Sequence, residues 1–242
     1  MQQTGGKAME HNIRLALSIC FTSKWHSGSG EGNLLLDRLV RKDARNRPYI
    51  PGSTLKGVIR ENCEKLSRTL KYPDPSDPHQ TDLTIQDNFH PLHKLCSPVD
   101  RIFGNKYEGG CLFFRDARLR EEPYYGFLKS QTRICKYRKL GTAKAQHLFS
   151  SEYAGPIKFE TAIDGYHDDL ACFEEAYPPY AYYILIAGIM MTDRIGGDKS
   201  TGSGNVEISF DALEYNGESL SLEDMFQYLD SELYTMTREE CL

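Results

Sequence analysis

The stretch RPYIPGSTLKGVIRENCEKL (residues 47–66) joins a proline-glycine turn to a run with helical spacing. Apolar residues recur in it every three or four positions, as they do on one face of an amphipathic helix. They are Leu55, Val58, Ile59, Cys63 and Leu66, and Leu70 continues the pattern. Ser53 or Thr54 stands where a side chain can cap the helix N-terminus. The stretch therefore predicts an extended segment, a turn and a helix.

The first turns of this predicted helix combine cations with a glycine. Lys56 and Arg60 are four residues apart, so they share one helix face. Gly57 costs about 1 kcal/mol relative to alanine in a helix, but it lets another backbone come close because it has no Cβ. Free amides near Ser53 and the helix dipole attract anions. These features predict a phosphate site; a proline-started helix with ordinary surface cations is the alternative interpretation.

The composition of the chain is typical of a globular protein of the cytoplasm. Its 242 residues are 40% apolar and 11% aromatic, which suits a sizeable core. No apolar run approaches the roughly 20 residues of a membrane span, so no membrane partner is expected. Seven cysteines without tight pairing favour a reducing compartment. Residues 1–12 have no apolar signal core and are expected to form a mobile leader.

Charge is unevenly distributed along the chain. The formal net charge is −5, yet residues 207–242 hold ten acids and one arginine, which leaves 28 Lys and Arg against 24 Asp and Glu in residues 1–206. Residues 127–147 carry six cations and no acid. Such clusters predict a polyanionic partner, with a solvated surface as the alternative. The acidic segment 216–242 is expected to be a solvated end or a subunit contact.

The order of the predicted elements indicates an α+β fold. Strands are predicted at 13–21, 109–119, 155–164 and 205–215, and helices in the quoted stretch and at 178–193. The order strand, helix, strand, strand, helix, strand is that of a ferredoxin-like (RRM-like) core, which we expect to form one domain over 13–215.

Long insertions interrupt this predicted core. They are expected at 22–50, 72–104 and 120–150. The glycine- and serine-rich segment 22–33 is too polar to be expected in the core. Residues 125–145 predict a hairpin with its turn near Leu140 and Gly141.

The loop RIGGDKSTGSGN (residues 194–205) has four glycines. It is not a P-loop, because Asp198 stands where a glycine must precede the lysine and because the loop runs from a helix to a strand. It also lacks the third glycine of a dinucleotide site. What remains is an amide-rich loop able to follow a sugar-phosphate backbone, with a plain flexible connection as the alternative. Its candidate phosphate-contacting residues are Lys199, Ser200, Gly202 and Gly204.

Three stretches together resemble the signature motifs of the RAMP superfamily. They are PYIPGSTLKGVIR (48–60), DRIFG (100–104) and GGDKSTGSGNVEI (196–208). The resemblance covers about residues 13–210 and is greatest to the backbone subunit of type III CRISPR effector complexes, which are antiviral ribonucleoproteins. It implies a modified ferredoxin-like fold with a projecting β-hairpin thumb. The implied partners are CRISPR guide RNA, complementary target RNA and other type III effector subunits.

The resemblance also implies where the guide RNA binds. Its phosphates would lie along 51–57 and 196–204, which adds the helix residues Ser53, Lys56, Gly57 and Arg60 to the candidate RNA-binding residues. The thumb is implied near 133–146, where Lys136, Arg138 and Lys144 would extend the same track. Contacts to phosphate and sugar carry no sequence information, so any guide sequence would be accepted.

A catalytic acid is implied as well. In the cleaving members of the family an aspartate sits on the loop before the P-Y-I-P motif, and Asp37 stands eleven residues before Pro48. Asp43 is the competing acid, and it aligns with an ordinary turn residue. Asp37 would assist attack by the RNA 2′-OH directly or through a divalent metal, Mg²⁺ or Mn²⁺. His26 and Arg38 are lesser candidates for positioning the phosphate.

A zinc site is expected in the insertion before DRIFG. His90, His93 and Cys96 have the residue types that zinc accepts, and His79 or Asp100 could complete the set. Several members of the family carry a Cys/His zinc site at this place, although Asp100 stands where a cysteine is common. Exposed insertion histidines are the alternative.

Other functions stay open from the sequence. One is a non-cutting RAMP subunit that caps the filament, in which Asp37 is only structural. A second is a guide-processing endonuclease, which would need paired histidines that are not evident here. The third is a ferredoxin-like interaction or nucleotide-binding domain, against which the direction of the glycine-rich loop and the cation distribution both count.

Overall fold

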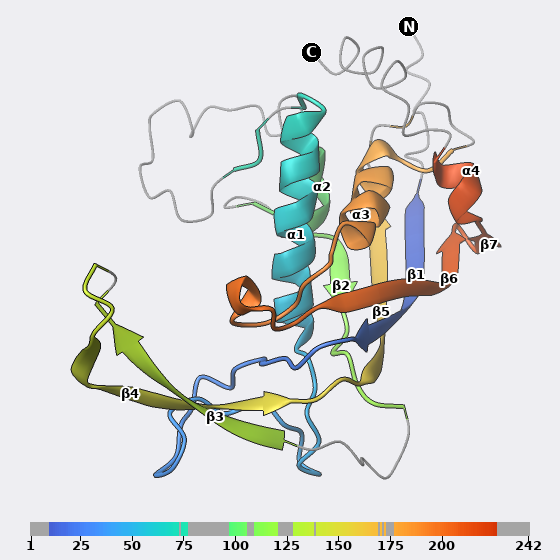
Figure 1. Ribbon diagram of the computed structural model, residues 1–242. Helices are drawn as coiled ribbons and strands as arrows, with labels where there is room; N and C mark the ends of the chain where they lie inside the picture. The colour runs from blue at the N-terminus through green and yellow to red at the C-terminus, as the bar shows by residue number, and fades with distance from the viewer. Residues whose placement is uncertain are drawn as a thin grey trace, which may run out of the picture.

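A five-stranded antiparallel sheet forms the centre of the molecule (Figure 1). Its strands stand in the order β2-β5-β1-β6-β7. They are β1 (His11–Phe21), β2 (Leu112–Phe114), β5 (Lys158–His167), β6 (Val206–Tyr215) and β7 (Glu218–Ser219). The structure is a computed structural model, and it describes residues 10–72, 74–76, 97–105, 109–120, 128–137, 139–168, 170, 172 and 177–226.

Two long helices complete the predicted order of elements. α1 spans Gly52–Thr69 and α3 spans Tyr180–Met190, while the short α2 spans Pro98–Phe103. The resulting order β1-α1-β2-β5-α3-β6, with β1 between β5 and β6, is the ferredoxin-like arrangement. The predicted α+β fold class is confirmed.

The main core lies between these helices and one face of the sheet. Ile13, Leu15 and Leu17 alternate along β1 and are buried, because successive strand residues point to opposite faces. They pack with α1 and with α3, of which nine of 11 residues are buried. α3 meets α1 closely at Gly188, where a Cβ would lie 2.3 Å from the Sγ of Cys63.

A second core cluster lies at the end of β1 and includes Trp25. The prediction that residues 22–33 stay outside the core is wrong at this residue, which is fully buried. Its ring stacks on Phe21 with centroids 4.7 Å apart, and its indole N–H donates to the carbonyl of Gly155 at 2.9 Å. A single tryptophan thus anchors a segment whose average polarity is high.

The predicted hairpin is present as a second, two-stranded sheet. β3 (Leu128–Lys136) and β4 (Ala143–Ala154) pair antiparallel and are inserted between β2 and β5. Gly141 forms the turn with a φ of 64°. Figure 1 shows this hairpin, the thumb, projecting away from the sheet and helices. Its second strand extends further than expected, because it pairs with β3 as far as Ala154, opposite Leu128. Ala154 also bridges to Trp25.

Several predicted boundaries are corrected by the structure. His11 and Asn12, expected in the leader, pair with His167 and Tyr166 in the sheet. The strand predicted at 109–119 is regular only at Leu112–Phe114 and continues as isolated bridges. The expected acidic segment begins with β7 and the short α4 (Leu222–Phe226). None of the helices that the structure describes is long and apolar enough to cross a membrane.

Candidate functional site

The segment that carries Asp37 lies against the root of the thumb. The amide of Asp37 donates to the carbonyl of Ser150 at 2.9 Å, and its carboxylate accepts from the amide of Ser150 at 2.6 Å. One residue further on, the carbonyl of Arg38 accepts from the amide of Glu152 at 2.9 Å. The segment therefore runs beside β4 like an added strand, and the Asp37 side chain is exposed on it.

Glu152 fixes the same segment from the inside. Its buried carboxylate accepts from the amide of Val40 and from the ammonium of Lys42, both at 2.9 Å. Its carbonyl lies 2.7 Å from Nδ1 of His26, a side chain that is also buried. The His26 ring thus connects its own segment to the backbone of β4 at Glu152. Its buried position does not support the expectation that it positions a phosphate.

Asp43, the competing acid, shapes a turn. Its carboxylate accepts from the backbone amides of Arg45 and Arg47 and pairs with the Arg47 guanidinium at 2.9 Å. Burial would raise the pKa of Asp43, but these hydrogen bonds outweigh this effect and hold the pKa below its ordinary value. This is the role of an ordinary turn acid that the sequence predicted.

An ion cluster around Asp198 lies beside the Asp37 segment. Asp198 binds Arg38 at 2.9 Å and Arg133 at 3.2 Å, and it accepts a hydrogen bond from the hydroxyl of Tyr153. Burial would raise the pKa of Asp198, but the hydrogen bond from Tyr153 and the two arginine charges outweigh this effect and lower the pKa below its ordinary value. Burial raises the pKa of Tyr153, and the hydrogen bond to Asp198 raises it further.

The start of α1 differs from the prediction. Neither Ser53 nor Thr54 caps it; the cap position is Pro51, and the amide of Gly52 donates to the carboxylate of Asp116 at 3.0 Å. Gly52 is also the glycine that permits a close approach, since a Cβ there would lie 2.2 Å from the carbonyl oxygen of Phe114. A carboxylate of the chain itself therefore occupies the first amide of the expected anion site.

Lys56 and Arg60 prove to be unlike each other. Arg60 pairs with Glu64 at 2.8 Å and with the buried Asp100 at 3.1 Å, and it also donates to the carbonyl of Gly104 at 2.8 Å. The prediction that Arg60 binds phosphate is not supported by these contacts, and Asp100, named as a possible zinc ligand, is bound to Arg60. Lys56 is half-buried, and burial followed by the nearby charge of Arg60 lowers its pKa.

Exposed backbone on α1 lies close to the glycine-rich loop. Gly57 is exposed, and a Cβ there would meet no heavy atom of the described residues within 4 Å. On α1, a hydrogen bond from Lys65 lowers the pKa of Glu61, and the charge of Lys199 lowers it further. Lys199 of the loop therefore lies close to α1. Figure 1 shows the loop before β6 beside α1. The two predicted stretches of guide contact therefore lie on one side of the molecule.

Within the loop the two candidate glycines have different roles. Gly202 has a φ of 79° and faces open space, next to the exposed Ser200. Gly204 is buried, its amide donates to the carbonyl of Lys24 at 2.8 Å, and a Cβ there would lie 2.3 Å from the carbonyl oxygen of Ile195. Gly204 therefore shapes the loop, and only Gly202 of this pair is exposed.

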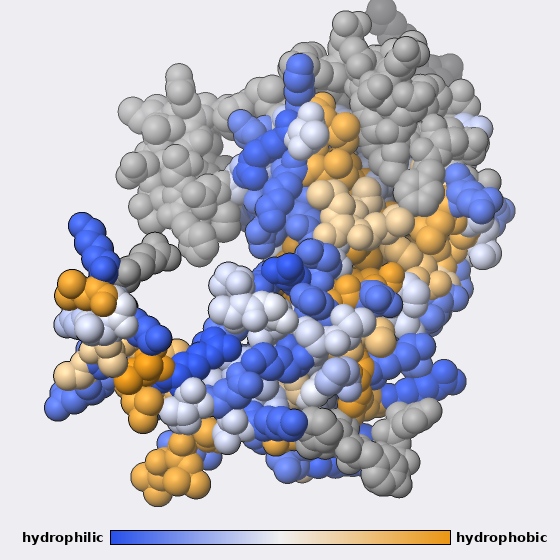
Figure 2. Space-filling model, viewed as in Figure 1, coloured by the Kyte–Doolittle hydropathy of each residue, from blue (hydrophilic) through white to orange (hydrophobic). Residues whose placement is uncertain are grey.

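The thumb presents both cations and apolar side chains. Lys136 is exposed, and the ammonium of Lys144 lies 5.1 Å from the centroid of the Tyr137 ring. Ile134 and Leu148 are directly paired across the strands, and both are exposed. Figure 2 shows the thumb standing off from the body of the molecule with an open hollow beside it.

Some predicted site residues lie outside the described residues. They are Arg138 of the thumb and the zinc candidates His79, His90, His93 and Cys96. In the part of the chain that the structure describes, no group of three or more His, Cys, Asp or Glu side chains could hold a metal ion. The zinc site stays a prediction.

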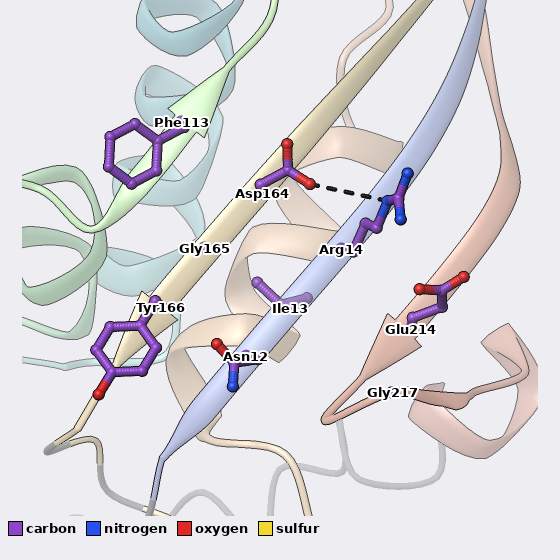
Figure 3. Close-up of a pocket in the computed structure, with 9 residues that line it drawn as sticks. All are labelled: Asn12, Ile13, Arg14, Phe113, Asp164, Gly165, Tyr166, Glu214 and Gly217. Atoms are coloured by element: carbon purple, nitrogen blue, oxygen red, sulfur yellow. Dashed lines mark ion pairs between the residues drawn. The ribbon is translucent and has the colours of Figure 1, made fainter.

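A cavity of about 370 Å³ lies elsewhere, on the sheet near the start of β1. Figure 3 shows Phe113, Asp164, Arg14 and Glu214 in a row across four strands, with Arg14 and Asp164 3.9 Å apart. The segment that carries Asp37 comes after Phe21, at the other end of β1 from this cavity. Because this row has two acids and one arginine, the cavity does not suit a phosphate-rich partner.

The fold and these motifs agree with a comparison with known families. A model of the RAMP superfamily matches residues 19–228. The chain belongs to the RAMP superfamily. No curated protein matches the chain significantly.

Two solved structures share the RAMP fold with this chain. One is the type III-B Cmr-beta complex bound to cognate target RNA; its matching chain is 13% identical, with a TM-score of 0.53, over 81% of this chain and 96% of that chain. The other is the apo state of Cmr-beta, 13% identical with a TM-score of 0.51, over 85% of this chain and 98% of that chain. Both were determined by cryo-EM.

Three residues of this RAMP site have no sequence motif that singles them out. Asp116 binds the start of α1, and Arg133 and Tyr153 bind Asp198. The acid-free stretch 127–147 marks Arg133 only as one cation among six. Their roles depend on contacts between segments far apart in the chain.

Proposed function

We propose that this chain is a guide-RNA-binding backbone subunit of a type III CRISPR effector complex and that Asp37 cleaves complementary target RNA. Membership of the RAMP superfamily and the likeness to chains of Cmr-beta, one of them bound to target RNA, support the class of complex. The observation that carries the cutting role is the exposed carboxylate of Asp37, held at the root of the thumb by its hydrogen bonds to Ser150.

The guide RNA follows the side of the molecule where α1 and the glycine-rich loop lie together. Ser53, Lys56 and Gly57 contribute from α1, and the exposed Ser200 and Gly202 contribute from the loop with Lys199. The absence of a Cβ at Gly57 leaves room for a sugar-phosphate backbone. Recognition through phosphate and sugar accepts any guide sequence.

The target RNA meets the thumb next to Asp37. The exposed pair Ile134 and Leu148 supplies apolar surface for bases, and Lys136 and Lys144 supply charge for phosphates. Opening the duplex there brings a target 2′-OH into line with its own 3′-phosphate. One oxygen of Asp37 is bound to Ser150, and the other is available to accept the proton of that hydroxyl. As the 2′-oxygen bonds to phosphorus, the P–O5′ bond breaks, which leaves a 2′,3′-cyclic phosphate and a 5′-hydroxyl that takes its proton from water.

A divalent metal is compatible with this site. Mg²⁺ keeps several waters and takes one or two carboxylates together with substrate phosphates, so one exposed aspartate beside an RNA phosphate fits it. When bound, Mg²⁺ or Mn²⁺ supplies charge stabilisation for the reacting phosphate. Asp37 is the residue that would hold it.

A non-cutting RAMP subunit is the second candidate function. The hydrogen bond from Ser150 is also what a purely structural aspartate accepts at such a junction. In that case the guide track is the same and the target stays intact. A ferredoxin-like interaction domain of another class would bind no RNA at all.

Cleavage by the assembled complex distinguishes these functions. The chain is purified with its neighbouring subunits and guide, and complementary RNA is added with Mg²⁺ or Mn²⁺. We expect cuts at regular intervals that disappear with Asp37→Asn, which keeps an acceptor for Ser150 and removes the charge. Intact target with the wild-type complex supports the non-cutting subunit, and a chain that purifies without RNA contradicts both RNA-binding functions.

A further inference from the structure

Asp198 joins three separate segments of the chain. Its carboxylate binds Arg38 from the Asp37 segment, Arg133 from β3 and the hydroxyl of Tyr153 from β4. Asp198 itself belongs to the glycine-rich loop. One side chain thus connects the expected guide contact, the thumb and the segment that carries the cutting residue.

The surroundings of Asp198 separate it from an ordinary surface ion pair. Its φ is 59°, a left-handed conformation that aspartate tolerates better than most residues. Its side chain is 18% exposed, against 39% for Arg38 and 26% for Arg133. Exposed ion pairs are weak because solvent screens them, and this one is largely shielded.

The cations around Asp198 outnumber the acids. Besides Arg38 and Arg133, the ammonium of Lys24 lies 4.9 Å from the centroid of the Tyr153 ring, and the Arg133 guanidinium lies 5.4 Å from it. One carboxylate neutralises only one of three cations. The cluster therefore retains positive charge, which suits a position next to RNA.

Arg38 connects the ion pair with Asp198 to the segment that carries Asp37. Its Nε donates to the hydroxyl of Ser151 at 2.9 Å, and its carbonyl is bound to the amide of Glu152. Asp37 is the preceding residue, and its two hydrogen bonds to Ser150 need the same alignment between the segment and β4. A displacement of Arg38 along β4 would displace Asp37 with it.

We infer that Asp198 is a positioning residue, which acts through Arg38 to hold the Asp37 segment in register on the thumb. Its effect on cutting rests on the proposed function. The contact by which Asp198 and Arg38 hold the Asp37 segment on β4, here called the clamp, is a property of the chain itself. Because Lys199 and Ser200 follow directly, the loop that touches the guide also sets the alignment of Asp37.

Hydrogen exchange of the full-length chain tests the clamp without any activity. Asp198→Ala should speed exchange at the amides of Asp37 and Glu152 by about tenfold, because their partners lie across the junction that the clamp holds, while β1 and α3 stay protected. Unchanged exchange at these two amides overturns the inference, whatever the chain does with RNA. If Asp198→Ala does not fold, Asp198→Asn serves, since asparagine tolerates the left-handed backbone.

The matched control is the acid that directly precedes the same loop. Asp193 is mostly exposed and pairs with its neighbour Arg194 at 3.8 Å. Asp193→Ala should leave exchange at Asp37 and Glu152 unchanged. An equal increase in both variants would show a general loosening of the loop and would contradict a specific role of Asp198.

Cleavage by the assembled complex gives the second readout. At saturating target, Asp198→Ala should lower the single-turnover rate by about tenfold with target affinity unchanged, and Asp198→Glu should restore part of the rate. Combined with Arg38→Gln, the losses should be less than additive. Additive losses, or parallel losses of affinity and rate, overturn the inference. A wild-type complex that does not cut refutes the proposed cutting function. In that case the hydrogen-exchange experiment alone tests whether Asp198 holds the Asp37 segment on β4.

Discussion

The carboxylate of Asp37 accepts a hydrogen bond from the backbone amide of Ser150 at 2.6 Å, while the amide of Asp37 donates to the carbonyl of Ser150 at 2.9 Å. The two residues are 113 positions apart in the chain. This reciprocal contact fixes an exposed acid to the thumb. It leaves one carboxylate oxygen available for chemistry.

Two substitutions of Asp37 separate its charge from its hydrogen bond. Asp37→Asn keeps an acceptor for Ser150, and Asp37→Ala removes both. We expect both variants to lose cutting by a factor of at least about 100 and to keep guide and target affinity, because one exposed carboxylate adds little to the binding of a polyanion. Cleavage gels and filter binding on the assembled complex measure the two effects.

The control for Asp37 is the turn acid Asp43. Asp43→Asn retains an acceptor for the amides of Arg45 and Arg47 and should keep most of the cutting activity. Full cutting by Asp37→Asn beside an inactive Asp43→Asn would identify Asp43 as the catalytic acid. Joint loss of binding and cutting in Asp37→Ala would indicate a structural role.

Gly57→Ala should raise stability and lower RNA affinity at the same time. A Cβ at this position meets nothing among the described residues, so the helix should gain about 1 kcal/mol in the free energy of unfolding. The same Cβ would occupy the space that a guide backbone needs. Thermal unfolding and RNA binding measure the opposed changes, and unchanged RNA affinity would place the guide elsewhere.

Gly52→Ala is the matched variant at the start of the same helix. Its Cβ would lie 2.2 Å from the carbonyl oxygen of Phe114, so α1 or β2 must shift. We expect a lower melting temperature. A melting temperature equal to the wild-type value would show that this junction relaxes freely.

Lys56→Ala and Lys199→Ala should each weaken RNA binding independently of RNA sequence. Each removes one phosphate contact, so the slope of log affinity against log salt should fall by roughly 0.7 per lysine on single-stranded RNA. Lys65→Ala is the control, because that exposed lysine pairs with Glu61 further along α1. Losses that depend on RNA sequence would argue against a contact to the backbone.

Arg60→Ala should act on stability rather than on RNA. It leaves the buried Asp100 without its arginine partner, at a cost on the order of 3 kcal/mol in the free energy of unfolding. Urea unfolding measures this loss. An Arg60→Ala chain that is as stable as the wild type but binds RNA more weakly would show that Arg60 contacts RNA phosphate after all.

The pH dependence of stability reports the Asp198 cluster. Because the pKa of Asp198 is lowered in the folded chain relative to an ordinary aspartate, the cluster stabilises the fold at neutral pH and loses this contribution as pH falls through the folded pKa. The difference in unfolding free energy between wild type and Asp198→Asn should therefore be full at pH 5 to 7, about one unit or more above an ordinary aspartate pKa, and shrink in stronger acid. A difference that grows in acid would contradict the assignment.

Local patterns in the sequence determined the order of the elements. The spacing of apolar residues in α1, the apolar run of α3 and the alternation along β1 depend on near neighbours, so they are visible without the fold. The same holds for the thumb, whose turn at Gly141 needs a positive φ. These patterns were enough to predict the ferredoxin-like core.

Tertiary structure alone decided which polar residues are available for function. Lys56 and Arg60 look equivalent in the sequence, yet the packing of α2 on α1 brings Asp100 to Arg60 and commits it to the interior. Asp116 reaches the start of α1 and Asp198 reaches Arg38 in the same way. Such partners lie 40 to 160 residues apart, and the energy of a charge depends on what surrounds it, which local spacing does not record.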